Sequence, residues 1–422
     1  MDEGEHEGSS GARRLLDDAR RLTTTLVEHV RLAPEVRVVH PAGATRRWLE
    51  IVEELSLVIV TEQTAAVRAH VARHPLVAEV ADGDRADVAL ARLTDGGTLR
   101  LWFTPAKRSG ATQIVATGSP AHVAGLRARA AAAGRDLEAI EGLEGAVYAA
   151  LGLPWLPPEI RDGDDELTRA AAGERFDDLV TIADITGAVH CHTVYSDGKN
   201  TIRQMAEAAG ERGLAFLTIT DHSKAAHYAG GIDDAKLREQ WREIERLQPG
   251  TEVRLVRGTE ADILADGSLD VPAPALPELE LVIASVHTRH KLDQDGMTRR
   301  LVTAMRQPFF KVWGHALGRM VLRRDPIDVR FEEVLDAVVE GPAAIEINGD
   351  PNRLDLDPVR VRQAHARGVR FVLSSDAHAA GELDYLENAV AMARRARLRP
   401  ADILNTLPPD EFLAAVRPVS HR

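Results

Sequence analysis

The chain has 422 residues, of which 44% are hydrophobic and 28% charged, and a formal net charge of −13. This length favours two domains over one core, and the composition is that of a soluble globular protein without an apolar stretch long enough to span a membrane. The acidic balance argues against a protein that coats nucleic acid through bulk electrostatics, but it does not exclude a local basic surface.

The N-terminus and the cysteine content indicate the compartment. Residues 1–12 are polar and acidic, where a signal peptide would be basic and then apolar, so we expect a disordered tail there. Cys191 is the only cysteine, which excludes an intrachain disulfide and is compatible with a reducing compartment. We therefore expect a cytoplasmic protein.

The N-terminal half alternates helical and strand-like segments. Residues 13–31 have the apolar spacing of an amphipathic helix, and three strand-like runs follow. A proline-rich stretch, LGLPWLPPEIRDGDD, then ends the last helix and marks a linker. The expected strands are 35–43, 55–61 and 98–104, and the further expected helices are 120–134 and 138–151. This order predicts a mixed α+β domain at 13–160.

From Gly187 onward, short apolar strands alternate with helical periods, which is typical of a parallel α/β barrel. We expect a linker at 161–186 and a barrel domain at 187–422. The expected barrel helices are 200–213, 233–247, 331–341, 357–368 and 381–398.

Side chains of the metal-ligand type come directly after the apolar runs of this second half. Strand ends are where such barrels keep their chemistry, so these side chains predict a multinuclear metal site at the barrel mouth. The nine candidates are His190, His192, Asp197, His222, Glu260, His287, His315, Asp376 and His378.

Two features of this set suggest its chemistry. His190 and His192 are two residues apart on one strand, so both rings face one side, and Cys191 faces the other as a packed, non-ligating thiol. Glu260 lies between histidine groups and is placed to bridge two ions. Mixed imidazole and carboxylate ligands suit zinc, manganese or iron, and the expected reaction is hydrolysis by a water that the bound metals activate.

The order of these motifs, HxH, SDG, TDH, GxE, SVH, GH and DAH, resembles that of the PHP (polymerase and histidinol phosphatase) superfamily. The resemblance implies a distorted (β/α)7 barrel that holds three divalent metal ions. It assigns His190, His192, Glu260 and Asp376 to the first ion, Glu260, His287 and His315 to the second, and Asp197, His222 and His378 to the third.

The likeness is more specific to the C-terminal PHP domain of bacterial family X DNA polymerases. The segments that carry it are HTVYSDGKNTI, ITDHSKAAHYAGGID, DILADGSLD, AIEINGDPNRLDL and DILNTLPPDEFL. This resemblance implies a manganese-favouring 3′-to-5′ exonuclease and end-processing phosphodiesterase, and therefore DNA 3′ ends and DNA repair as the setting.

The N-terminal half resembles the palm and thumb of those polymerases in truncated form. Where the family carries its catalytic aspartates, this chain has Glu54, Ser56 and Arg100. Two-metal nucleotidyl transfer needs oxygen ligands at these positions, so we expect polymerase activity to be lost. Gly118 and Ser119 match a nucleotide-contacting segment, and with the nearby basic residues they are candidates for DNA contact or for an ordinary turn and solvated helix face. These basic residues are Lys107, Arg108, Arg127 and Arg129.

Four cations follow ligand-bearing or strand-end segments and are candidates for binding substrate phosphate. They are Lys224, Arg289, Lys291 and Arg353.

Three other functions stay open on the sequence. One is a small-molecule phosphatase of the histidinol-phosphatase type, to which the polymerase remnant would be of no evident use. Another is an amidohydrolase barrel, which also begins with His-x-His but typically bridges its metals with a carbamylated lysine. The third is a non-catalytic module that binds DNA ends.

Overall fold

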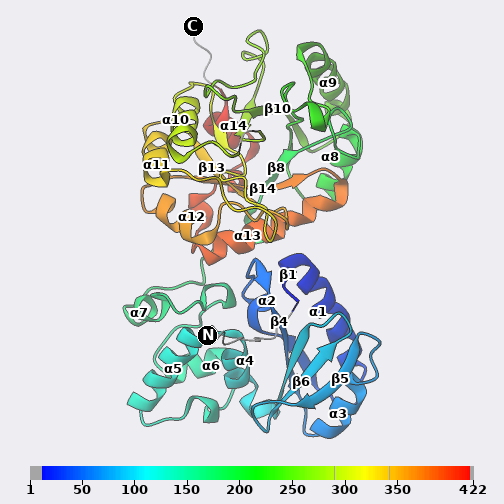
Figure 1. The fold of residues 1–422 in the computed structure, drawn as a ribbon, viewed down its shortest axis with the longest axis vertical. Coiled ribbons are helices and arrows are strands. Elements are labelled where there is room, and N and C mark those ends of the chain that lie inside the picture. Colours follow the sequence, from blue (N-terminus) through cyan, green and yellow to red (C-terminus); the bar gives the residue numbers. More distant parts are fainter. Residues whose placement is uncertain (1–11, 289, 342, 419–422) are drawn as a thin grey trace, which may run out of the picture. The chain divides into compact units, whose positions relative to one another are not determined.

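The computed structural model describes residues 12–288, 290–341 and 343–418, and the chain divides into two compact units between Asp178 and Leu179. Residues 1–11 of the expected tail, and Arg289, lie outside the described residues. Figure 1 shows the first unit in blue to cyan and the second in green to red.

Unit 1 is built on a five-stranded sheet in the order β2-β4-β7-β6-β5. The central strands β4 and β7 run parallel, and the other neighbours are antiparallel. A small two-stranded sheet pairs β1 with β3. The strands are β1 (Arg14–Leu15), β2 (Val38–Pro41), β3 (Ile51–Val52), β4 (Glu54–Val60), β5 (Val77–Asp82), β6 (Val88–Leu93) and β7 (Thr98–Thr104). The α+β architecture expected for this half is confirmed.

Some helices of unit 1 pack on this sheet, and others follow its last strand in the sequence. The expected helix at 13–31 begins only at Leu16, because Arg14 and Leu15 pair with β3 instead. The expected helix at 138–151 begins at Glu144, after a turn in which Gly142 has a φ of +113°. The helices are α1 (Leu16–Arg31), α2 (Gly43–Arg46), α3 (Thr64–Val71), α4 (Ser109–Thr117), α5 (Pro120–Ala132), α6 (Glu144–Ala150) and α7 (Glu166–Ala171).

The segment that we interpreted as a linker, 161–186, contains regular structure at its start. Arg161 is fully buried, and Glu166 at the start of α7 is a buried partner of His122. The first part of this segment therefore packs within unit 1.

Unit 2 is a closed barrel of seven parallel strands in which the last strand, β14, pairs with the first, β8. This confirms the (β/α)7 barrel expected from the sequence. The strands are β8 (Gly187–Cys191), β9 (Phe216–Ile219), β10 (Arg254–Asp262), β11 (Leu281–Ser285), β12 (Val312–Trp313), β13 (Ala344–Asn348) and β14 (Phe371–Ala377).

Five of the barrel helices lie within their expected ranges, and two further helices, at 294–305 and 409–416, were not among those expected. Thr201 caps α8 through a reciprocal hydrogen-bonded box with Gln204, and Asp233 and Asp357 cap α9 and α12. The helices are α8 (Ile202–Glu211), α9 (Asp234–Leu247), α10 (Gln294–Met305), α11 (Phe331–Glu340), α12 (Pro358–His365), α13 (Leu386–Arg395) and α14 (Pro409–Val416).

The last helix, α14, closes the amino end of the barrel. Phe412 stacks on Phe216 with ring centroids 4.5 Å apart, and Leu413 and Val416 join the same core of strand-start residues. This apolar plug leaves the carboxyl end of the strands as the open end. None of the helices in the described part of the chain combines the length and apolar character that a membrane crossing requires.

Candidate metal centre

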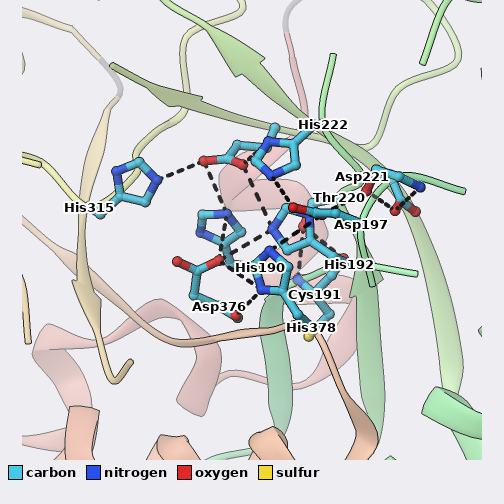
Figure 2. A network of polar contacts seen from close by, with 12 residues as sticks. His190, Cys191, His192, Asp197, Thr220, Asp221, His222, His315, Asp376 and His378 are labelled. Atoms are coloured by element: carbon cyan, nitrogen blue, oxygen red, sulfur yellow. Dashed lines mark hydrogen bonds and ion pairs between the residues drawn. The ribbon is translucent and has the colours of Figure 1, made fainter. Parts of the chain in front are cut away.

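The structure brings all nine predicted ligand side chains together at the carboxyl end of the barrel strands (Figure 2). They form four overlapping groups in which one atom from each residue lies within 4.8 Å of the others. The groups are His192, Asp197, His222 and His378; His190, Glu260 and His315; His190, His192 and Asp376; and His222, Glu260 and His287.

Glu260 is the centre of this cluster. Its Oε1 lies 2.9 Å from His315 Nε2 and 3.1 Å from His287 Nε2, and its Oε2 lies 2.8 Å from His222 Nδ1. The two carboxylate oxygens of Glu260 thus contact different imidazoles. Glu260 belongs to two of the four groups, as a residue that bridges two ions would.

Each of the remaining two groups contains one aspartate. Asp376 Oδ1 lies 3.3 Å from His192 Nε2 and 3.5 Å from His190 Nε2. Asp197 lies 3.4 Å from His378 Nε2 and 3.6 Å from His222 Nε2. The side chains of Asp197 and His378 are about a third exposed, whereas that of Glu260 is fully buried, so the Asp197 group is the outer one.

The backbone leaves regular strand geometry where it delivers these ligands. His190, His315 and Asp376 have φ values of +63°, +24° and +51°. The pairing register shifts beside two of them, between Ala188 and Cys191 and between Ser374 and Ala377. A positive φ strains the backbone of any residue other than glycine, and strained residues of this kind are often found at functional sites. Simple alternation along β8 therefore does not account for the convergence of His190 and His192.

Buried polar groups that the sequence analysis did not identify orient the ligands. His190 donates from Nδ1 to Glu346 Oε1 at 2.6 Å, which turns its Nε2 toward the cluster. The other Glu346 oxygen accepts from the backbone N–H of His315, and Asn348 donates to both Glu346 and Asp376. Glu346 thus fixes one imidazole and the backbone of a second candidate ligand.

Asp262 and Asp221 act in the same way on other parts of the site. Asp262 accepts from His287 Nδ1, and Asp221 accepts from the backbone N–H of Thr193 and Ser196 in the loop that leads to Asp197. A signal for both was present in the sequence. Asp262 lies two residues after Glu260 on the same strand, and Asp221 directly precedes His222.

The protonation states differ across the cluster. Burial and the neighbouring His378 and His222 lower the pKa of His192 to about 3, so that this ring is neutral. Burial opposes protonation of His222 as well, but Glu260 and Asp197 overcome it and raise the pKa to about 10. Asp197 and Asp376 similarly raise the pKa of His378 to about 9. The carboxylates thus stabilise positive charge, here carried by protons that a metal ion would displace.

The donor set fits divalent metal ions. Several buried atoms that face the cluster have no hydrogen-bond partner, including both ring nitrogens of His192, His190 Nε2, His287 Nε2 and Glu260 Oε2. Unpaired buried polar atoms are costly, and bound cations would offset this cost by coordinating those that face the four groups. Cys191 is also buried, with a pKa raised to about 12 by burial, but it belongs to none of the four groups.

The candidates for phosphate binding lie in different surroundings. Arg353 is largely buried, and its Nε lies 3.3 Å from Asp376 Oδ2. Lys224 is exposed and lines a surface cavity of about 500 Å³ whose wall includes Asp233, Asp234 and Asp270, which makes that wall unsuited to phosphate. Lys291 is exposed, and no contact with the cluster is found for it in the described residues. Arg353 is thus the one described candidate that touches a ligand.

In unit 1, Glu54, Ser56 and Arg100, which we matched to polymerase aspartates, lie on one face of β4 and β7. Ser56 and Arg100 are direct cross-strand partners. Arg100 donates to Glu54 at 2.8 Å and to Asp84 at 2.9 Å, and Trp102 donates to Ser56 Oγ. Within residues 12–178, no cluster of potential ligands comparable to the barrel site is found. The guanidinium of Arg100 thus lies between the carboxylates of Glu54 and Asp84.

Four of the DNA-contact candidates of unit 1, Lys107, Ser119, Arg127 and Arg129, have internal partners. Ser119 caps α5 by accepting from His122 N–H, and its hydroxyl donates to the Asp162 carbonyl. Lys107 pairs with Glu141, and Arg127 pairs with Glu138. Arg129 donates to the Leu151 carbonyl. These contacts favour the structural interpretation of this segment.

Known proteins match both parts of the chain. A model of the PHP domain family matches residues 188–349. The DNA polymerase/3′-5′ exonuclease PolX of Bacillus subtilis is 30% identical over 404 residues, which cover 92% of this chain and 70% of the relative. A probable phosphatase of Caldanaerobacter subterraneus is 28% identical over 234 residues, which cover 51% of this chain and 85% of that protein. A probable phosphatase of Vibrio vulnificus is 29% identical over 216 residues, which cover 47% and 80%.

The PolX match includes most of unit 1 as well as the barrel, because it covers 92% of the chain. The family match also removes the amidohydrolase alternative, in agreement with a glutamate at the centre of the cluster. The chain therefore belongs to the PolX family, and its barrel is a PHP phosphoesterase domain.

Proposed function

We propose that the barrel site hydrolyses the terminal phosphodiester bond at DNA 3′ ends, in DNA repair. The observation that carries the proposal is the convergence of all nine ligand-type side chains at the open end of the barrel, in a chain similar over 92% of its length to a polymerase and 3′-5′ exonuclease. The similarity outside the barrel supports a DNA substrate, because a small-molecule phosphatase has no evident use for a polymerase-like unit.

We propose that the nine side chains hold three divalent ions, of manganese, zinc or iron. Bound ions of this kind lower the pKa of a water and neutralise the phosphoryl oxygens. The chain's own groups do the rest. Glu346 and Asp262 orient His190 and His287, and Arg353 places a fixed cation beside Asp376, where it can stabilise charge that develops on the phosphate.

A phosphomonoesterase acting on small molecules is the second candidate. It is favoured by the probable phosphatases that match about half of the chain. The two candidates share the metal centre and differ in what lies around it, so they are separated by substrate and not by ligand variants.

A substrate panel with the manganese-loaded full chain tests the proposal. We expect shortening of 5′-labelled single strands and primer termini from the 3′ end, and loss of this activity in His192→Ala and Asp376→Ala. His365→Ala, which changes a half-exposed histidine paired with Asp402, is the matched control and should act like the parent. Intact DNA ends together with efficient hydrolysis of small phosphate esters would establish the second candidate instead. DNA-end binding that survives His192→Ala, with no turnover in the parent, would indicate a non-catalytic module.

A further inference from the structure

One large aromatic side chain stands in solvent at the edge of the metal centre. Tyr228 is 67% exposed and lies in the short 3₁₀ turn His227–Ala229, between β9 and α9. Its ring centroid is 6.4 Å from that of His222 and 6.2 Å from that of His287. The ring therefore borders two candidate ligands while most of its surface faces water.

A fixed loop holds this ring in place. Ala226 and Ala229, on either side of Tyr228, are buried. The loop is tied at both ends, because Ala225 N–H donates to Asp270 and Ile232 N–H donates to the His222 carbonyl at 2.8 Å. Gly231 packs so closely that a Cβ there would lie 2.0 Å from the Ser223 carbonyl oxygen. The exposure of Tyr228 is thus imposed by the fold.

No use for Tyr228 within the fold is evident. Among the described residues, no hydrogen bond engages its hydroxyl, and its ring contacts are those with His222 and His287. Because this exposed ring borders the metal centre and makes no hydrogen bond through its hydroxyl, it is a candidate for binding a ligand there. The same metal centre also holds a cation, because Arg353 Nε lies 3.3 Å from Asp376 Oδ2.

A flat exposed ring at a site that also holds a cation is a combination that suits single-stranded nucleic acid. Every nucleobase has a face that stacks on an aromatic ring, and cations beside the ring follow the phosphates. Sugar phosphates and other aliphatic phosphate esters have no such face, whereas histidinol phosphate has one in its imidazole ring. The surroundings of the metal centre therefore favour a nucleotide substrate over a small aliphatic phosphate ester.

We propose that Tyr228 stacks on the base of the 3′-terminal nucleotide whose phosphodiester bond the metal centre hydrolyses. This inference rests on the proposed function and names the part of the DNA end that the site recognises. Tyr228 is a specificity residue in this role. It binds the base independently of its identity, so the site prefers ends that carry a terminal base over ends that have lost it.

Two measurements on the full chain test the stacking. The first uses metal-free protein and a single-stranded oligonucleotide with 2-aminopurine as its 3′-terminal base, whose fluorescence falls when the base stacks. We expect quenching with the parent and with Tyr228→Phe, which keeps the ring and removes the hydroxyl, and little quenching with Tyr228→Ala. A parent that binds without quenching, or a Tyr228→Ala protein that quenches equally, would overturn the inference.

The second measurement compares manganese-supported cleavage of ends with and without a terminal base. The parent and Tyr228→Phe should favour the base-bearing end by about 5- to 100-fold in kcat/KM, the range expected for one base stacked on an aromatic ring. Tyr228→Ala should bring this ratio close to one, because it removes the ring that distinguishes the two ends. An unchanged ratio in Tyr228→Ala would contradict the stacking. Failure of the parent to cleave any DNA end, with quenching intact, would instead defeat the proposed function and leave the base-binding site supported.

Discussion

At the scale of single residues, the metal centre depends on carboxylates that are not themselves in any of the four ligand groups. Glu346 is fully buried and fixes both His190 and the backbone of His315. The sequence pointed to the ligands because each follows an apolar run. It did not point to Glu346. A buried carboxylate needs a hydrogen-bonding partner to offset the cost of its burial, and the sequence alone does not show which residue is that partner.

We expect Glu346→Gln to weaken metal binding without unfolding the barrel. The change keeps the shape of the side chain but removes the negative charge that holds the proton on His190 Nδ1. Loss of such an orienting partner typically costs about 10- to 100-fold in metal affinity or activity. Metal content after dialysis and kcat/KM at rising manganese concentration measure it. Glu332→Gln, at an exposed glutamate of α11, is the control, and equal metal retention in both variants would contradict the assigned role.

A second buried carboxylate, Glu144, stabilises unit 1. Arg161 and Arg46 donate to it at 2.6 Å and 2.8 Å, and although burial alone would raise its pKa, these arginines lower it from 4.5 to about 2. A depressed pKa contributes stability above the unfolded value and loses it as the pH falls. This contribution is therefore complete above pH 4.5 and disappears between about 4.5 and 2.

We expect Glu144→Gln to lower the free energy of unfolding by roughly 3 to 5 kcal/mol at pH 7, because it leaves the buried Arg161 without its anionic partner. The difference from the parent should stay constant above pH 5 and shrink as the pH falls below about 4.5. Calorimetric unfolding of the full chain across this range measures it. A gap that widens on acidification would show that Glu144 does not carry the stabilising charge.

At the scale of elements, the sequence predicted periodic segments well and irregular ones poorly. β7 occupies the expected residues 98–104, where apolar and aromatic side chains dominate. β5 was missed, because its mainly exposed residues VAEVAD have no apolar alternation. The positive φ values of His190 and Asp376 were equally unforeseen, since only the packing of the closed barrel can impose them on residues other than glycine.

The Asp197 loop illustrates how closely an element must pack to deliver a ligand. Gly198 lies against the backbone after β8, and a Cβ there would be 2.6 Å from the carbonyl carbon of His192 and from Thr193 N. This contact explains the glycine of the SDG motif. An added methyl group must push the loop, and with it Asp197, away from His378 and His222.

We therefore expect Gly198→Ala to fold but to lose roughly 10- to 100-fold in phosphoesterase activity, the cost of a ligand misplaced by about 1 Å. Steady-state hydrolysis, with circular dichroism to verify the fold, measures this. Gly210→Ala is the matched control, because a Cβ in α8 would meet only Val253 at an ordinary 3.5 Å. Equal activity of the two variants would mean that the loop is not held by this contact.

At the scale of the whole molecule, the family and the barrel were predictable, because the motif order along seven strands constrains both. The role of unit 1 was less accessible. Its sequence is similar to that of a PolX polymerase, and its sheet carries an ion-paired cluster of Arg100 with Glu54 and Asp84. Ion pairs across strands cannot be inferred from one sequence, since they depend on register.

We expect no nucleotide incorporation by the full chain in primer extension with either magnesium or manganese. The physical reason is the cation of Arg100 between Glu54 and Asp84, which repels divalent ions at that sheet face. The His192→Ala variant is used in this assay, so that 3′-end degradation cannot hide extension. Template-dependent extension by that variant would contradict the assignment of a degenerate palm.

The closure of the barrel has a consequence for biosynthesis. The first strand, β8, brings His190 and His192, and the last strand, β14, brings Asp376 and His378. Because a ribosome releases the chain from its N-terminus and domains fold as units, a growing chain lacks these partners until residue 378 has emerged. The ligand set is thus completed only when translation of the barrel is almost finished, and a chain that terminates before residue 376 lacks both Asp376 and His378.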